Sequence, residues 1–197
     1  MKMRKVIDLC KAAGELRLYE HEGVQWISDG WALYPLWGMP ALTPEGLCTA
    51  YDIPDKKWEK IQFVYDPTGI PKAIDTADIA DGEKKAIRAP LWIRWGGMSL
   101  VPFAVSTGVV WLDAAYLTPF EKDDRLELYE RRSPDGRLYF AVKVGFELVG
   151  ILFPAALPHK ELTVDLEILA KQCRLSLENE QKATPEDEVE QMGLEGA

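Results

Sequence analysis

One short pattern occurs twice in the chain and constrains its fold more than any other feature. Leu16-Arg17-Leu18-Tyr19-Glu20 returns 110 positions later as Leu126-Glu127-Leu128-Tyr129-Glu130. Two later matches follow in the same order, Gly23 with Gly136 and Pro40-Ala41-Leu42 with Pro154-Ala155-Ala156-Leu157. The period is too long for a solenoid. The repetition predicts two similar α-β-β-β units in one domain, with a sheet that packs one face onto two helices. Two unrelated three-stranded meanders, each after a short helix, would also look alike, and this alternative stays open.

The first copy carries clear signals for a helix and three strands. Val6, Leu9, Cys10 and Ala13 follow helical spacing over residues 4–13, and Gly14 is placed to end the helix. Alternating apolar residues predict strands over 15–20, 24–28 and 31–36, with Asp29-Gly30 as a hairpin turn. Beyond this copy, Thr43-Pro44-Glu45 predicts a helix over 43–52.

The middle and last thirds complete the expected elements. Strands are predicted over 61–65, 91–95, 100–105 and 109–112, and residues 71–89 read as a loop. The second copy is predicted to contain a short helix over 113–120, capped by Asp113, and strands over 125–130, 138–143 and 146–153. A helix is predicted over 162–180, although residues 163–168 also alternate with period two, so its first turn could instead be a strand. Residues 181–197 are predicted to be an acidic disordered tail. The fold class expected is α+β, with antiparallel sheets and short helices. Residues 1–180 would form one domain of two units, about 1–70 and 100–180, joined by a variable segment.

Three stretches resemble the family of DNA sliding clamps, the processivity factors of replicative polymerases. Trp26-Ile27-Ser28-Asp29-Gly30-Trp31-Ala32-Leu33 is similar to a clamp strand that runs into a tight turn, with Ser28 in the place of a threonine. Val110-Trp111-Leu112-Asp113-Ala114-Ala115-Tyr116-Leu117 resembles a clamp strand entering an inner helix, and Leu148-Val149-Gly150-Ile151-Leu152-Phe153-Pro154 a closing strand. The likeness covers residues 1–42 and 101–157. It departs from the family in lacking a strand before the first helix and in having no counterpart for residues 43–100.

The resemblance implies a non-enzymatic protein of phage or mobile-element origin that tethers or assembles factors on double-stranded DNA. Clamp helices contact phosphates through Lys and Arg, so the expected nucleic-acid-binding residues are Lys2, Arg4, Lys5 and Lys11. With one such domain per chain, a ring would need a homo-oligomer of six. The acidic residues around the second helix would repel a duplex: Asp113, Glu121, Asp123 and Asp124. These acids and the net charge of −9 favour an alternative, a protein–protein interaction module of the same fold that binds no DNA.

Other kinds of function find little support in the sequence. No nucleotide-binding or hydrolase motif occurs, and neither His21 nor His159 belongs to a metal-ligand spacing, so we expect no catalytic residue, metal or cofactor. The carboxylates of Asp75, Asp78 and Asp81 are predicted to be solvated rather than to bind a divalent metal.

The remaining patterns concern aromatic residues and location. Trp92 and Trp95 are predicted to lie in core or half-buried sheet, whereas an exposed pair would indicate a binding groove. The longest apolar run, residues 148–157, is about half the length of a membrane span, and Asp8 and Lys11 interrupt any leader, so we expect a cytoplasmic protein without membrane contact.

Overall fold

A computed structural model describes residues 1–156, 164–169 and 171–172. The helices are α1 (Met3–Ala13), α2 (Pro44–Ala50), α3 (Asp55–Trp58) and the 3₁₀ helix η1 (Ala114–Phe120). The strands of the first half are β1 (Glu15–His21), β2 (Val24–Ser28), β3 (Ala32–Pro35) and β4 (Gln62–Asp66). The later strands are β5 (Lys84–Lys85), β6 (Ile87–Arg88), β7 (Ile93–Trp95), β8 (Met98–Val105), β9 (Gly108–Asp113), β10 (Leu126–Arg132), β11 (Leu138–Val144) and β12 (Glu147–Leu152).

Local signals place most of these elements where the sequence predicts them. In α1, the apolar stripe buries Val6, Ile7 and Cys10, and Gly14 ends the helix with a φ of 71°, a conformation that glycine adopts without strain. The Thr43 side chain accepts a hydrogen bond from the Gly46 N–H, which caps α2. The predicted loop over 71–89 also contains two short strands, β5 and β6, which the weak polar pattern did not indicate.

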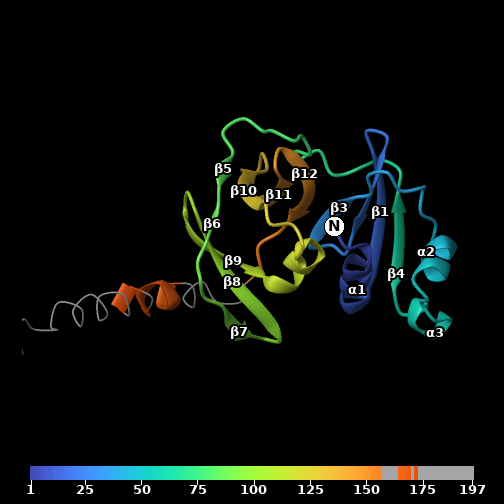
Figure 1. Ribbon diagram of the computed structural model, residues 1–197, viewed down its shortest axis with the longest axis horizontal. Coiled ribbons are helices and arrows are strands. Elements are labelled where there is room, and N and C mark those ends of the chain that lie inside the picture. Colours follow the sequence, from blue (N-terminus) through green and yellow to red (C-terminus); the bar gives the residue numbers. More distant parts are fainter. Residues whose placement is uncertain (157–163, 170, 173–197) are drawn as a thin grey trace, which may run out of the picture. The chain divides into compact units, whose positions relative to one another are not determined.

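An eight-stranded sheet, here called sheet A, joins the two halves of the fold (Figure 1). Its strand order is β4-β1-β2-β3-β12-β11-β10-β5, so the meander β1-β2-β3 meets the meander β10-β11-β12 through their last strands. This β3–β12 junction is antiparallel and pairs Leu33 with Ile151 and Ala32 with Leu152. The other pairs are antiparallel as well, except that β4 adds parallel to β1.

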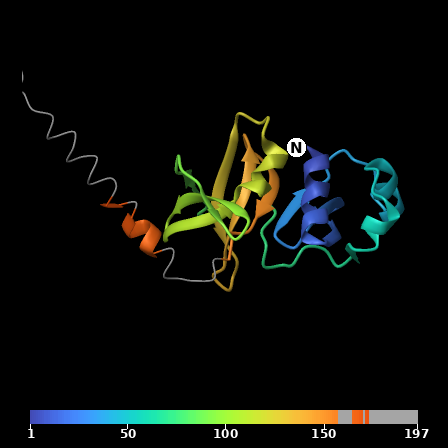
Figure 2. The same cartoon turned by 90° about the horizontal axis from the view of Figure 1, so that it is seen from below.

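The helices α1 and η1 contact each other on one face of sheet A (Figure 2). Their apolar side chains pack with Leu18 of β1 and Leu128 of β10 in one core. Phe120 of η1 lies against the ring of Tyr34, with the centroids 5.8 Å apart. Burial of this face supplies most of the apolar area that stabilises the fold.

The opposite face of sheet A is covered by the segment from 67 to 83, which links β4 at one edge to β5 at the other. Ile70 and Ile74 of this segment pack against a second apolar cluster that includes Tyr19 and Tyr139. Tyr129 lies against the same cluster. Leu18 and Leu128 therefore face the helices, whereas Tyr19 and Tyr129 face this crossing segment.

A smaller four-stranded sheet, sheet B, is formed by β6, β7, β8 and β9. Both β6 and β7 pair with the same side of β8, and β9 pairs with its other side. Phe103 of β8 packs on Phe140 of β11 with ring centroids 5.5 Å apart, so sheet B closes the second half of the helix-side core.

The chain divides into a unit of residues 1–155 and a unit of residues 156–197. In the second unit, residues 164–169 and 171–172 are helical and expose Val164, Ile168 and Leu169. The rest of the predicted helix over 162–180 and the predicted tail over 181–197 lie outside the described residues. Among the helices that the structure describes, none is long and apolar enough to cross a membrane.

Candidate nucleic-acid interface

The four basic residues singled out by the sequence lie together at α1. Lys2 is its N-cap residue, and Arg4, Lys5 and Lys11 lie within the helix. The side chains of Arg4 and Lys5 are exposed because Val6, Ile7 and Cys10 occupy the buried face. The helix therefore presents a basic outer surface, as a phosphate-binding helix requires.

Acidic side chains neutralise part of this surface. The Lys2 ammonium lies 2.9 Å from a Glu121 carboxylate oxygen. Asp8 lies between two bases on the outer face of α1, 3.9 Å from the Arg4 guanidinium and 3.5 Å from the Lys11 ammonium. Of the four bases, only Lys5 forms no ion pair within the described part of the chain. Hydrated pairs of this kind are weak and exchange readily with phosphate.

Three of the acids near the second helix, which were expected to repel DNA, instead cap the helix or form ion pairs. Asp113 accepts a hydrogen bond from the Ala115 N–H and so caps η1. Glu121 pairs with Lys2, and Asp123 lies 3.8 Å from the N-terminal amine. These pairs link the end of η1 to the start of α1. They reduce the negative charge that a duplex would meet here.

Near α1 and η1, four titratable side chains lie close to one another: Cys10, Asp29 and Tyr34 are buried, and Tyr116 is half-buried. Asp29 in the β2–β3 turn accepts hydrogen bonds from the N–H groups of Trp31 and Ala32 through Oδ1. Burial raises the pKa of Asp29 above its ordinary value, although these hydrogen bonds oppose the shift. Burial, together with the charge of Asp29, also raises the pKa values of Cys10 and Tyr116. The raised pKa values favour the protonated forms of these groups, which does not suit a nucleophile or a metal ligand.

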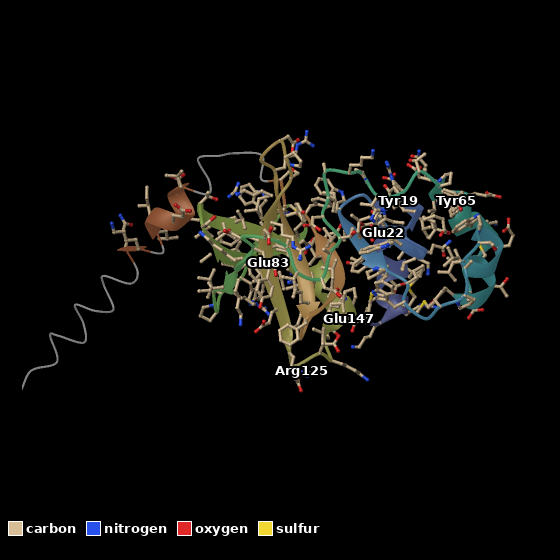
Figure 3. All side chains as sticks on the ribbon, turned by 90° about the horizontal axis from the view of Figure 1, so that it is seen from above. Tyr19, Glu22, Tyr65, Glu83, Arg125 and Glu147 are labelled. Carbon is tan, nitrogen blue, oxygen red and sulfur yellow. The ribbon has the colours of Figure 1, made fainter. Side chains whose placement is uncertain are left out.

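A second buried charged cluster lies on the opposite face of sheet A. Glu83, at the end of the crossing segment, pairs with Arg131 of β10 at 2.7 Å and with Lys143 of β11. Arg131 also donates to the backbone carbonyls of Asp75 and Ala77. Burial alone would raise the pKa of Glu83, but the hydrogen bonds from Lys143 and Arg131 outweigh it and lower the pKa. Figure 3 labels Glu83 over the second half of the sheet. The cluster fastens the crossing segment and has the satisfied geometry of a structural ion network.

The carboxylates and histidine considered for metal binding are engaged otherwise. The Asp78 side chain accepts from the Leu148 N–H, and Asp75 accepts from the Ala77 N–H. His21 is half-buried at the end of β1, with Nε2 3.1 Å from the Thr76 hydroxyl. Within the described ranges, no group of three or more potential ligands could hold a metal ion. His159 lies outside them.

The prediction for Trp92 and Trp95 is wrong. Trp92 is 65% exposed and Trp95 is 37% exposed, at the edge of sheet B. Their edge position explains the error, because apolar spacing alone does not tell a central strand from an edge strand. The neighbouring Arg88 and Arg94 are exposed as well. The sequence could have indicated that these arginines lack acidic neighbours, because residues 84–112 contain no Asp or Glu.

No family model, no curated protein and no solved structure matches this chain.

Proposed function

We propose that the chain is a non-catalytic, clamp-like protein that tethers partners to double-stranded DNA through the outer surface of α1. One observation carries the proposal: the strand order of sheet A runs inward through two meanders to the β3–β12 junction, with α1 and η1 side by side on one face. The clamp resemblance implies this plan, in which two units present paired helices to the duplex.

The orientation of the repeated residues supports the same plan. Leu18 and Leu128 hold matching places in the two copies of the pattern, and both face the helices. Tyr19 and Tyr129 also hold matching places, and both face the crossing segment. A one-residue offset between the copies would have put these side chains on opposite faces.

The distribution of charge is compatible with binding DNA. Residues 1–156 contain 19 Lys and Arg and 22 Asp and Glu, a net charge of −3, so the remaining residues contribute −6 of the total −9. The described fold is therefore close to neutral. Three bases on the outer face of α1 can act locally on phosphates at low salt, where the attraction between these charges is least screened.

Fluorescence anisotropy with a labelled DNA duplex tests the proposal on the full chain. If three phosphates are contacted, log K falls against log salt with a slope of about −2.7. Reversing Arg4, Lys5 and Lys11 to Glu should abolish this binding. Reversing Lys72, Arg132 and Arg137, which are also exposed, makes the same change in net charge and should weaken binding only slightly. Equal losses in the two triple variants, or no binding by the unchanged chain, would contradict the proposal.

The alternative is a protein–protein interaction module of the same fold that binds no DNA. The ion pairs of Lys2, Arg4 and Lys11 favour it, since they leave little free positive charge on α1. Exposed aromatic side chains such as Trp31 and Trp37 favour it as well. Light scattering on eluted protein discriminates between the two: a closed oligomer supports the clamp-like assembly, and a monomer that binds no duplex supports the module.

A further inference from the structure

The exposed edge of sheet B combines aromatic and basic side chains without acidic neighbours in sequence. Arg88, Trp92, Arg94 and Trp95 lie on the strands β6 and β7 and in the segment between them, and they are here called the Trp–Arg edge. Within an acidic chain, residues 84–112 hold four basic residues and no acidic one. Trp92 is among the most exposed large apolar side chains of the described fold. Exposed aromatic side chains that are grouped together commonly mark an interaction site.

The two arginines of this edge keep their charge available. Neither Arg88 nor Arg94 forms an ion pair in the described part of the chain, whereas Arg4, Arg17, Arg131 and Arg137 all do. Arg88 lines a groove of about 690 Å³ between η1 and the strands β5, β6 and β10. The acids of that groove already have partners: Glu121 pairs with Lys2, Asp123 with the N-terminal amine, and Glu127 with Lys85.

The backbone of the edge argues against a partner that adds a strand. Strand pairing along this side is broken between Arg88 and Ile93, where Pro90 lacks an N–H group. Edges interrupted in this way resist β-augmentation. Recognition must therefore come from side chains. Exposed indoles with unpaired guanidinium groups offer stacking surfaces and phosphate contacts at the same time.

We infer that the Trp–Arg edge binds single-stranded nucleic acid, with bases stacked on Trp92 and Trp95 and phosphates held by Arg88 and Arg94. The chemistry suits a flexible strand, because the unstacked bases of a single strand can reach exposed rings that a closed duplex would not. The inference is independent of the proposed duplex contact at α1, which uses a different helix and different residues.

The experiment uses the full chain and a labelled oligo-dT of about 16 nucleotides, followed by anisotropy and by quenching of tryptophan fluorescence. We expect binding with quenching. The double variant Trp92→Ala, Trp95→Ala should lose affinity at least about tenfold, since each stacked base contributes about 1–3 kcal/mol. Arg88→Ala, Arg94→Ala should make the salt slope shallower by about 1.4.

Matched controls use exposed residues elsewhere in the same fold. Trp31→Ala, Trp37→Ala removes two indoles of similar exposure, and Arg132→Ala, Arg137→Ala removes two exposed guanidinium groups. Both should retain binding of the oligonucleotide. Absence of binding by the unchanged chain, equal losses in the controls, or equally tight binding of polyglutamate would overturn the inference. The triple α1 variant and the Lys72, Arg132 and Arg137 triple variant have the same net charge, so they should bind oligo-dT equally well. This comparison keeps the oligo-dT result interpretable even if the duplex proposal fails.

Discussion

Glu83 is the residue on which the charge balance behind the sheet depends. The side chains of Arg131 and Lys143 are 3% and 4% exposed, and Glu83 is the carboxylate that pairs with both. Glu83→Gln removes its charge and leaves two buried cations. Loss of one partner from a buried ionic group typically costs 3–5 kcal/mol, so we expect the variant to lose about 3 kcal/mol of unfolding free energy at neutral pH. Urea denaturation measures it.

The lowered pKa of Glu83 also gives this contribution a pH dependence. Because the native pKa lies below the ordinary value of 4.5, the stabilisation is complete above that pH and is lost as the pH falls through the native pKa. The Glu83→Gln variant should not show this loss of unfolding free energy at low pH. Glu127→Gln is the matched control, since its partner Lys85 is largely exposed, and it should leave the urea midpoint nearly unchanged. Equal destabilisation by the two substitutions would contradict the argument.

Gly150 is a second residue with a defined steric task. A Cβ built there would lie 2.9 Å from the ring carbon Cζ of Phe120 and 3.4 Å from the Leu33 carbonyl oxygen. Gly150→Ala should therefore cost about 1–3 kcal/mol through overpacking. Phe120→Leu in the same chain should recover part of that loss, which a double-mutant cycle would record as a favourable coupling. If the free-energy changes of the two substitutions simply add, the Phe120 ring is not what the new methyl group clashes with.

At the scale of elements, the β2–β3 turn is held by Asp29. Its Oδ1 satisfies the N–H groups of Trp31 and Ala32, and Oδ2 is buried without a hydrogen-bond partner among the described residues. The raised pKa means that the charged form opposes folding. Stability attributable to Asp29 is therefore greatest in acid and falls as the pH rises from 3.8 through the native pKa.

Two substitutions separate the charge of Asp29 from its role in the turn. Asp29→Asn keeps an acceptor for both N–H groups and removes the buried charge, so its stability at pH 7 should equal or exceed that of the unchanged chain. Asp29→Ala leaves the N–H groups of Trp31 and Ala32 without this acceptor, and because the Ala32 donor is buried the change should cost about 1–3 kcal/mol. Thermal unfolding at several pH values measures both variants. A larger loss in Asn than in Ala would refute this account of the turn.

Elements bounded by strong local chemistry were predictable from the sequence. Gly14 ends α1, Thr43 caps α2 and Asp113 caps η1, as predicted. The short strands β5 and β6 were not predicted, because each contains only two residues and an alternating pattern cannot be recognised over so short a stretch. The exposure of Trp92 and Trp95 was not predicted for a different reason: it depends on which strand lies at the edge of sheet B, and the spacing of apolar residues does not show this.

At the scale of the whole molecule, sequence periodicity predicted α+β architecture but not how distant segments meet. The repeated Leu-x-Leu-Tyr-Glu pattern places its leucines and tyrosines on opposite faces of sheet A in both copies. The path of the segment 67–83 across sheet A could not be predicted from the sequence. It depends on ion pairs of Glu83 with Arg131 and Lys143, which lie 48 and 60 positions further along the chain. The acids near η1 likewise gain their partners from α1, at the far end of the sequence.

The division of charge between the two units gives a prediction for the full chain. Both apolar cores lie within residues 3–153, and residues 158–197 carry a net charge of −6. Ending the chain after Leu157 should therefore leave the unfolding midpoint nearly unchanged and make the net charge less negative, −3 instead of −9. With less repulsion, the shortened chain should bind both duplex and oligo-dT more tightly at low salt, and this gain should vanish at high salt. Calorimetry and anisotropy across a salt series measure these effects. A large fall in midpoint would mean that the removed residues belong to the core, and a salt-independent gain would mean that they cover a binding surface rather than repel the ligand.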